Sequence, residues 1–167
     1  ENTIVVFWSD HGFKLGEHNA FSKYTNYEID TRIPLIIAFP EKITPGRSCE
    51  ALVESADLYP TLCALAGLPV PDGLHGVSLA PLFEDPVEPV KDAIFTLCGR
   101  QRPSVVTSDG TRFKGNGYAI RTDRYRYVLW VEQDNLNRDK LGPDLDAERI
   151  AEVELYDLKN DPGEHVN

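Results

Sequence analysis

Two short apolar runs mark the first forty residues of the chain. Residues 3–8 read Thr-Ile-Val-Val-Phe-Trp, and residues 33–39 read Ile-Pro-Leu-Ile-Ile-Ala-Phe. Both runs are rich in β-branched and aromatic residues and are bounded by turn residues, which is typical of buried strands. Pro34 suits the start of the second strand, where its missing N–H does least harm. We therefore expect two buried strands, the first followed by a polar loop at its carboxyl end.

A helical spacing follows between residues 57 and 67. Asp57 can cap the amino terminus of this helix and Gly67 can end it. Residues 76–83 predict a second, short helical turn. The apolar positions that share one face of the first helix are Leu58, Leu62, Leu65 and Ala66.

The pattern changes after an acidic, proline-rich stretch at residues 84–89. Beyond it the chain favours strands, and the segment 125–131 alternates apolar and polar residues as a half-exposed strand does. Other strands are predicted at residues 93–97, 118–122 and 153–158. We therefore predict two domains: residues 1–90 form the later part of an α/β domain, and residues 91–167 form a small antiparallel-sheet subdomain.

Composition narrows the possible classes of function. The chain has 167 residues and a formal net charge of −10, which argues against non-specific nucleic-acid binding because such proteins carry a basic face. No apolar run approaches the roughly 18 residues that suggest a membrane helix. An anionic substrate would have to be attracted locally, by a metal ion or a few cations, against an unfavourable overall field.

The loop after the first strand carries the candidate chemistry. Asp10 and His11 follow the strand directly; a carboxylate suits Ca²⁺ or Mg²⁺, and an imidazole suits transition metals. These two residues indicate part of a metal or catalytic site, or else an Asx turn beside a satisfied histidine. Lys23 either binds an anion or is a solvated surface lysine. Glu17 and His18 are expected to hold the loop together by hydrogen bonds.

Taken together, the motifs resemble the later part of type I sulfatases. The resemblance begins with Ser-Asp-His-Gly at residues 9–12, Leu-Gly-Glu-His at 15–18 and Lys-Tyr-Thr-Asn-Tyr-Glu at 23–28. It continues through residues 57–68 and 76–79 to residues 117–127 and 154–162. Within the family, the chain is most similar to the iduronate-2-sulfatase branch, because of the segment 23–27 and the Ile-Arg-Thr of residues 120–122 that leads to Tyr-Arg-Tyr.

This resemblance implies an alkaline-phosphatase-like α/β fold with a C-terminal antiparallel subdomain. It also implies hydrolysis of a sulfate ester, with a formylglycine hydrate as nucleophile and one Ca²⁺ ion at the sulfate. Matched residue by residue, Asp10 and His11 are metal ligands. Lys23 is the catalytic lysine that holds the sulfate and offsets its charge, and Phe13 lies near the sugar.

The family's Cys/Ser-x-Pro-x-Arg signature is absent from these 167 residues. We therefore expect the back part of a sulfatase, inactive alone, whose N-terminal part supplies the formylglycine and acts with it on a sulfated, uronate-containing glycan. A single parallel pair of strands cannot cover itself on both faces, which also indicates a missing front part. The family implies secretion or a periplasmic or lysosomal location. Two alternatives remain open: a phosphatase or phosphodiesterase of the same superfamily, and a non-catalytic binding domain.

Overall fold

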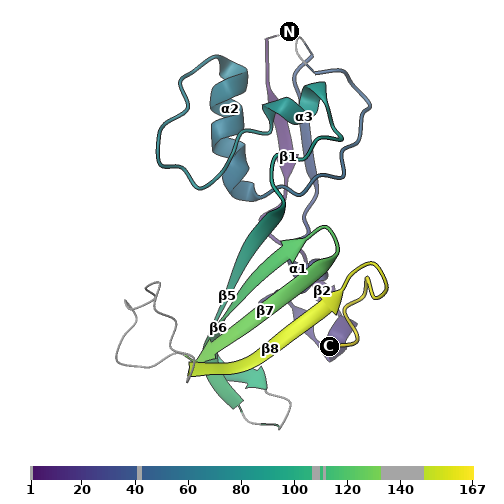
Figure 1. Cartoon of the computed structure of the whole chain (residues 1–167), viewed down its shortest axis with the longest axis vertical. Coiled ribbons are helices and arrows are strands. Elements are labelled where there is room, and N and C mark those ends of the chain that lie inside the picture. The colour runs from purple at the N-terminus through teal and green to yellow at the C-terminus, as the bar shows by residue number, and fades with distance from the viewer. Residues whose placement is uncertain (1, 41–42, 107–109, 111, 133–148) are drawn as a thin grey trace. The chain divides into compact units, whose positions relative to one another are not determined.

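The structure, a computed structural model, describes residues 2–40, 43–106, 110, 112–132 and 149–167. The chain forms two compact units (Figure 1). The first unit contains Glu1–Asp10 and Pro34–Ile94, and the second contains His11–Ile33 and Phe95–Asn167. The division into domains 1–90 and 91–167 stays a prediction, but the compact units place the loop of residues 11–33 with the later part of the chain.

Strands β1 (Val5–Trp8) and β4 (Leu35–Ala38) form a two-stranded antiparallel sheet in the first unit. Phe7 pairs with Ile36, so both side chains project from the same face, and they are 59% and 61% exposed. The expectation of buried strands in a parallel pair is therefore wrong. The apolar sequence makes the strands, but no second layer covers this face within the described residues.

Helix α2 (Leu58–Ala66) begins directly after η2 (Ser55–Asp57), a 3₁₀ helix of one turn. It ends at Gly67, which adopts the left-handed conformation with a φ of 71°. Asp57 does not cap α2. Its carboxylate accepts the backbone N–H of Glu54 in the capping box of η2 instead.

The buried side of α2 also differs from the predicted face. Thr61 is fully buried and accepts the N–H of Leu79 through its hydroxyl at 2.8 Å, whereas Ala66 is exposed. Hydrogen bonding to the segment before α3 (Ala80–Glu84) therefore turns the helix so that Thr61 and Cys63 face inward. The helical turn predicted at residues 76–83 is confirmed only in part, because α3 begins at Ala80; Leu79 and Leu82 are buried.

Asp57 is the polar centre of this unit. Its fully buried carboxylate accepts the N–H of Val77 at 2.8 Å and pairs with the ammonium of Lys91 at 2.7 Å. Burial lowers the pKa of Lys91, but the hydrogen bonds and charges of Asp57 and Glu54 outweigh it and raise that pKa above its ordinary value. One carboxylate thus joins η2, the segment before α3 and the end of the unit.

We expect Asp57→Ala to destabilise the chain by about 3–5 kcal/mol, because it leaves buried N–H groups and a largely buried ammonium without their partner. Urea unfolding followed by circular dichroism measures the change. Asp72→Ala, at an exposed position, is the control and should stay within about 0.5 kcal/mol of wild type. Equal stabilities of the two variants would contradict the role of Asp57.

The second unit is built on a four-stranded antiparallel sheet in the order β5-β6-β7-β8 (Figure 1). The prediction of a small antiparallel sheet is therefore confirmed, although β5 and β6 are longer than expected. The strands are β5 (Ala93–Val106), β6 (Arg112–Thr122), β7 (Tyr125–Glu132) and β8 (Ile150–Asp157).

One face of this sheet holds the core and the other stays exposed. Ala119, Val128 and Trp130 form the buried cluster, and the Trp130 indole donates to Glu154 at 2.7 Å. The opposite face presents apolar side chains to solvent: Phe95, Leu97, Tyr127, Val153 and Leu155. No helix in the described part of the chain is long and apolar enough to cross a membrane.

Candidate functional site

The loop of residues 11–33 contains four short elements. Strands β2 (Lys14–Leu15) and β3 (Phe21–Ser22) pair as a hairpin around the 3₁₀ turn η1 (Glu17–Asn19), and α1 (Glu28–Thr31) closes the loop. The Glu17 carboxylate accepts the N–H of Leu15 at 2.7 Å, and such backbone N–H bonds lower its pKa. Glu17 therefore holds the hairpin turn, as expected.

The hairpin brings His11 and Lys23 together. The Lys23 ammonium lies 2.5 Å from Nε2 of His11, and Nδ1 of His11 lies 2.7 Å from the carbonyl oxygen of Gly12. The neutral tautomer with its proton on Nδ1 satisfies both contacts: Nδ1–H donates to Gly12, and the lone pair of Nε2 accepts from Lys23. Both side chains are half-buried.

Asp10 and Phe13 are placed differently. Asp10 is exposed and is the last residue of the first unit before the chain crosses to His11. Phe13 is 53% exposed, so its ring is available to a ligand. Among the predicted site residues of the second unit, the structure brings His11 and Lys23 into direct contact.

Backbone strain surrounds Lys23. Ser22 and Tyr24 have φ values of 76° and 81°, which non-glycine residues rarely adopt and which cost on the order of 1–3 kcal/mol each. Such conformations persist only where the surrounding structure holds them in place. The loop that presents Lys23 is therefore set by its anchors and not by local preference.

The main anchor to the sheet is Asn26, which is 3% exposed. Its amide donates to the carbonyl oxygen of Gly117 at 3.1 Å and accepts the hydroxyl of Thr96 at 3.2 Å. Gly117 makes this approach possible, since a Cβ there would lie 2.5 Å from the Asn26 amide nitrogen. The buried guanidinium of Arg126 also donates to the Asn26 carbonyl oxygen.

Arg126 is paired on two sides by carboxylates. It contacts Glu28 of α1 and lies 2.7 Å from the carboxylate of Glu164, while Arg121 reaches Glu28 at 2.9 Å. Glu164 also accepts the N–H of Glu28 at 2.6 Å. Burial raises the pKa of Glu164, although the charge of Arg126 opposes that shift. This network joins α1, β7 and the last turn of the chain.

An aromatic cluster supports the other side of the loop. The His18 ring stacks on Tyr27 at a centroid distance of 3.8 Å, and His165 lies 5.4 Å from His18. Desolvation and the nearby charge of His165 lower the pKa of His18. His18 therefore holds the loop by ring stacking, whereas hydrogen bonding was expected.

Asp10 and His11 are of residue types that bind metal ions, but two ligands are too few for a complete site. The Nδ1–H bond of His11 to a backbone carbonyl leaves the lone pair on Nε2, as in a ligating histidine, but in this structure that lone pair accepts from Lys23. Calcium takes about six to eight oxygen ligands. Within the described ranges, no three His, Cys, Asp or Glu side chains are grouped so that they could hold a metal ion.

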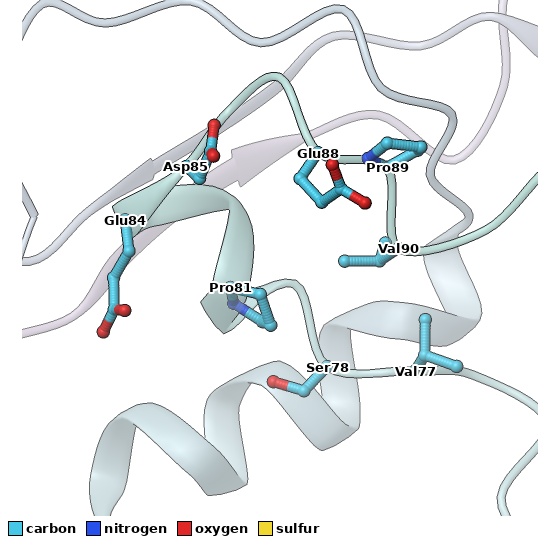
Figure 2. A pocket seen from close by; sticks show the side chains of 8 residues that line it. All are labelled: Val77, Ser78, Pro81, Glu84, Asp85, Glu88, Pro89 and Val90. Atoms are coloured by element: carbon cyan, nitrogen blue, oxygen red, sulfur yellow. The ribbon is translucent and has the colours of Figure 1, made fainter.

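An open depression lies in the first unit (Figure 2). The residues that line it include the acidic Glu84, Asp85 and Glu88 and the apolar Val77 and Val90. The Asp85 carboxylate accepts a hydrogen bond from the backbone N–H of Val87 at 3.1 Å. None of the predicted site residues contributes to it.

Sequence reasoning missed the residues that position this site. Lys14 and Asp30 are buried as a pair, and the partners of Glu28 lie on strands about one hundred residues away. Each is a common charged residue with no local motif. Pairing across such a distance in sequence leaves no signal in one chain.

Comparisons with known proteins identify the family of the chain. A sequence model of the family described as "N-sulphoglucosamine sulphohydrolase, C-terminal" matches residues 16–138. Iduronate 2-sulfatase of Mus musculus is 32% identical over 96% of this chain and 37% of that protein. The chain belongs to the sulfatase family.

Two further relatives bear on this sulfatase chain. N-acetylglucosamine-6-O-sulfatase of Bacteroides thetaiotaomicron is 33% identical over the whole chain and 26% of that protein. The structure of BT4656 with D-glucosamine-2-N,6-O-disulfate matches 98% of this chain and 29% of that one, with a TM-score of 0.74 and 30% identity. The sulfatase chain thus spans well under half the length of these relatives. The alkaline-phosphatase-like fold expectation is confirmed.

The aromatic cluster gives the sulfatase chain a pH dependence that can be measured. Because the folded-state pKa of His18 lies below its ordinary value of 6.5, the unfolded state binds more protons as the pH falls below that value, and stability declines. The thermal midpoint of His18→Gln should therefore fall less between about pH 7.5 and pH 5.5 than that of wild type. Differential scanning fluorimetry measures both.

The control is His75→Gln, at an exposed histidine, which should keep the wild-type decline. Glu164, whose raised pKa acts in the opposite sense, is present in all three proteins and cancels in the comparison. An equal decline in His18→Gln and wild type would contradict the role of His18.

Proposed function

We propose that this chain is part of a sulfatase that hydrolyses 2-O-sulfate esters of uronate residues in glycosaminoglycan-type glycans. The observation that carries the proposal is the set of contacts made by Lys23. Its ammonium lies against the imidazole of His11 and 5.7 Å from the centre of the Tyr24 ring. Neither contact neutralises its charge, so Lys23 can offset the negative charge of a sulfate group.

Lys14 makes the contrast clear. It belongs to the same loop, but it is buried against the carboxylate of Asp30 and so cannot serve an anion. Preorganised positive charge at the position where negative charge develops is a major source of catalysis. In a chain of net charge −10, a half-buried lysine without a carboxylate in these contacts is well suited to hold an anionic substrate.

The proposed roles follow from these positions. Lys23 binds the sulfate and stabilises its charge in the transition state, and the exposed ring of Phe13 contacts the sugar. Asp10 and His11 contribute ligands to one Ca²⁺ ion, which would polarise the sulfate oxygens. To ligate the ion, Nε2 of His11 exchanges its contact with the Lys23 ammonium for the metal. The remaining ligands and the formylglycine nucleophile come from the N-terminal part of the protein, which the relatives' greater length supports.

The uronate preference rests on the similarity to iduronate 2-sulfatase and on the segment 23–27. The chain is about equally identical to an N-acetylglucosamine-6-O-sulfatase, so a 6-sulfated N-acetylglucosamine is the competing substrate. A phosphatase or phosphodiesterase of the superfamily is the second candidate, and a secreted, periplasmic or lysosomal location is part of the proposal. Turnover assays on a 2-sulfated uronate disaccharide, a 6-sulfated glucosamine and a phosphate monoester separate these possibilities.

In the full-length protein that carries this chain, Lys23→Ala and Asp10→Ala should each lower kcat/KM for 4-nitrophenyl sulfate by at least about 100-fold, because each removes positive charge or a ligand from the sulfate site. Release of nitrophenol measures the rate. Lys159→Ala and Asp123→Ala, at exposed positions, are the matched controls and should keep wild-type rates. Wild-type turnover by Lys23→Ala would refute its catalytic role.

The 167 residues alone should show no sulfatase turnover, because the nucleophile is expected from another segment. Adding the separately expressed N-terminal part, with its formylglycine formed, should restore nitrophenol release. Robust turnover by the isolated chain would show that it holds its own nucleophile.

A further inference from the structure

The two arms of the loop that carry His11 and Lys23 meet at Asp30. The backbone oxygen of Asp30 accepts the N–H of Gly12 at 2.8 Å, one residue after His11. Its side chain accepts the N–H of Thr25 at 2.9 Å and the Thr25 hydroxyl, two residues after Lys23. One residue of α1 therefore fixes the chain on both sides of the His11–Lys23 contact.

The first arm has no room to shift. A Cβ on Gly12 would lie 1.9 Å from the backbone oxygen of Ile29, so the glycine backbone lies directly against α1. This close approach is possible only for glycine. It aligns the N–H of Gly12 with Asp30 and sets the direction in which the His11 ring leaves the backbone.

The second arm needs holding, because Ser22 and Tyr24 have left-handed φ values of 76° and 81° on either side of Lys23. On one side, Ser22 pairs with Lys14 in the β2–β3 hairpin. On the other, the Asp30 carboxylate holds Thr25. The Asp30 contacts oppose the relaxation of Tyr24 to a negative φ, which would swing the Lys23 side chain away.

Lys14 completes the clamp without adding charge to the site. Its ammonium contacts the Asp30 carboxylate and lies 3.1 Å from the Thr25 hydroxyl. The two side chains are 1% and 3% exposed, so the pair is buried and neutral as a whole. It can therefore orient Lys23 without competing for the anion that Lys23 binds.

We propose that Asp30, supported by Lys14, is the positioning residue that keeps Lys23 against His11. In the reaction, this means that Asp30 acts through Lys23 and touches neither substrate nor metal. The catalytic part of the inference rests on the proposed function. The positional part does not, since the His11–Lys23 contact can be observed without any turnover.

The first experiment observes that contact in the metal-free full-length protein by nitrogen-15 NMR of the histidine rings, with the His11 signals assigned from His11→Gln. In Asp30→Asn, the Nε2 resonance of His11 should move to the position that it has in Lys23→Ala, because the ammonium no longer reaches the ring. Asp157→Asn is the matched control. It removes the charge of a partly exposed carboxylate in the same unit, which pairs with Arg124 at 2.6 Å, and it should leave the resonance unchanged.

The second experiment is a double-mutant cycle in the full-length protein, assayed well below the melting temperature of each variant. Asp30→Asn should lower kcat/KM for 4-nitrophenyl sulfate by about 10- to 100-fold, the usual effect of misplacing a catalytic group. In the Lys23→Ala background it should cause no further loss, because the group that it positions is gone. A general loss of structure would lower the residual rate in both backgrounds.

Thr25→Ala is the second variant if Asp30→Asn does not fold, because it removes the hydroxyl contacts but leaves the Lys14–Asp30 pair intact. It should shift the His11 resonance and lower kcat/KM in the same direction. An unchanged resonance in both Asp30→Asn and Thr25→Ala overturns the proposal, as does an equal loss of activity with and without Lys23. An inactive wild type refutes the proposed function, while the NMR result still decides whether Asp30 positions Lys23.

Discussion

The buried guanidinium of Arg126 is the constraint on which the second unit depends. It projects from the middle of a sheet and forms ion pairs with the carboxylates of Glu28 and Glu164. Glu28 precedes Arg126 in the sequence and Glu164 follows it. Together with Arg121 the network contains two positive and two negative side chains, so it balances its own charge. Removing one member of such a buried pair costs much more than the pair contributes. The loop of residues 11–33 is therefore held to the sheet by charged side chains, and removing any one of them leaves a buried charge without its partner.

This constraint explains how a strained loop can present a lysine. Residues with positive φ on both sides of Lys23 would relax in an isolated peptide. Here Asn26, Glu28 and Asp30 alternate along the chain, and each is bonded to a different part of the unit. The energy of these buried contacts offsets the local strain. Among the described residues, the contacts of Lys23 are with the His11 and Tyr24 rings, which carry no negative charge, a useful property in a sulfatase chain that is acidic overall.

Much of the fold could be predicted from local pattern. The helix ending at Gly67, the short turn before Leu82 and the strands of the antiparallel sheet follow from apolar periodicity and turn residues, because these act within a few positions of each other. The burial of β1 could not be predicted, since it depends on which layer covers Phe7 and Ile36. The prediction of the buried face of α2 was wrong for a related reason: the hydroxyl of Thr61 accepts a hydrogen bond from the N–H of Leu79, which turns that side of the helix inward.

The sequence by itself determined the family and the chemical types at the site. The Asp10–His11 pair and Lys23 are recognisable because their motifs are contiguous in the chain. Only the tertiary structure decided that His11 and Lys23 are in contact, that Lys14 forms a buried ion pair with Asp30, and that residues 11–33 belong with the sheet. The physical reason is distance along the chain: Asn26 and Glu28 are fixed by strands near residues 117–126. A bond that spans about ninety residues leaves no trace in local composition or periodicity.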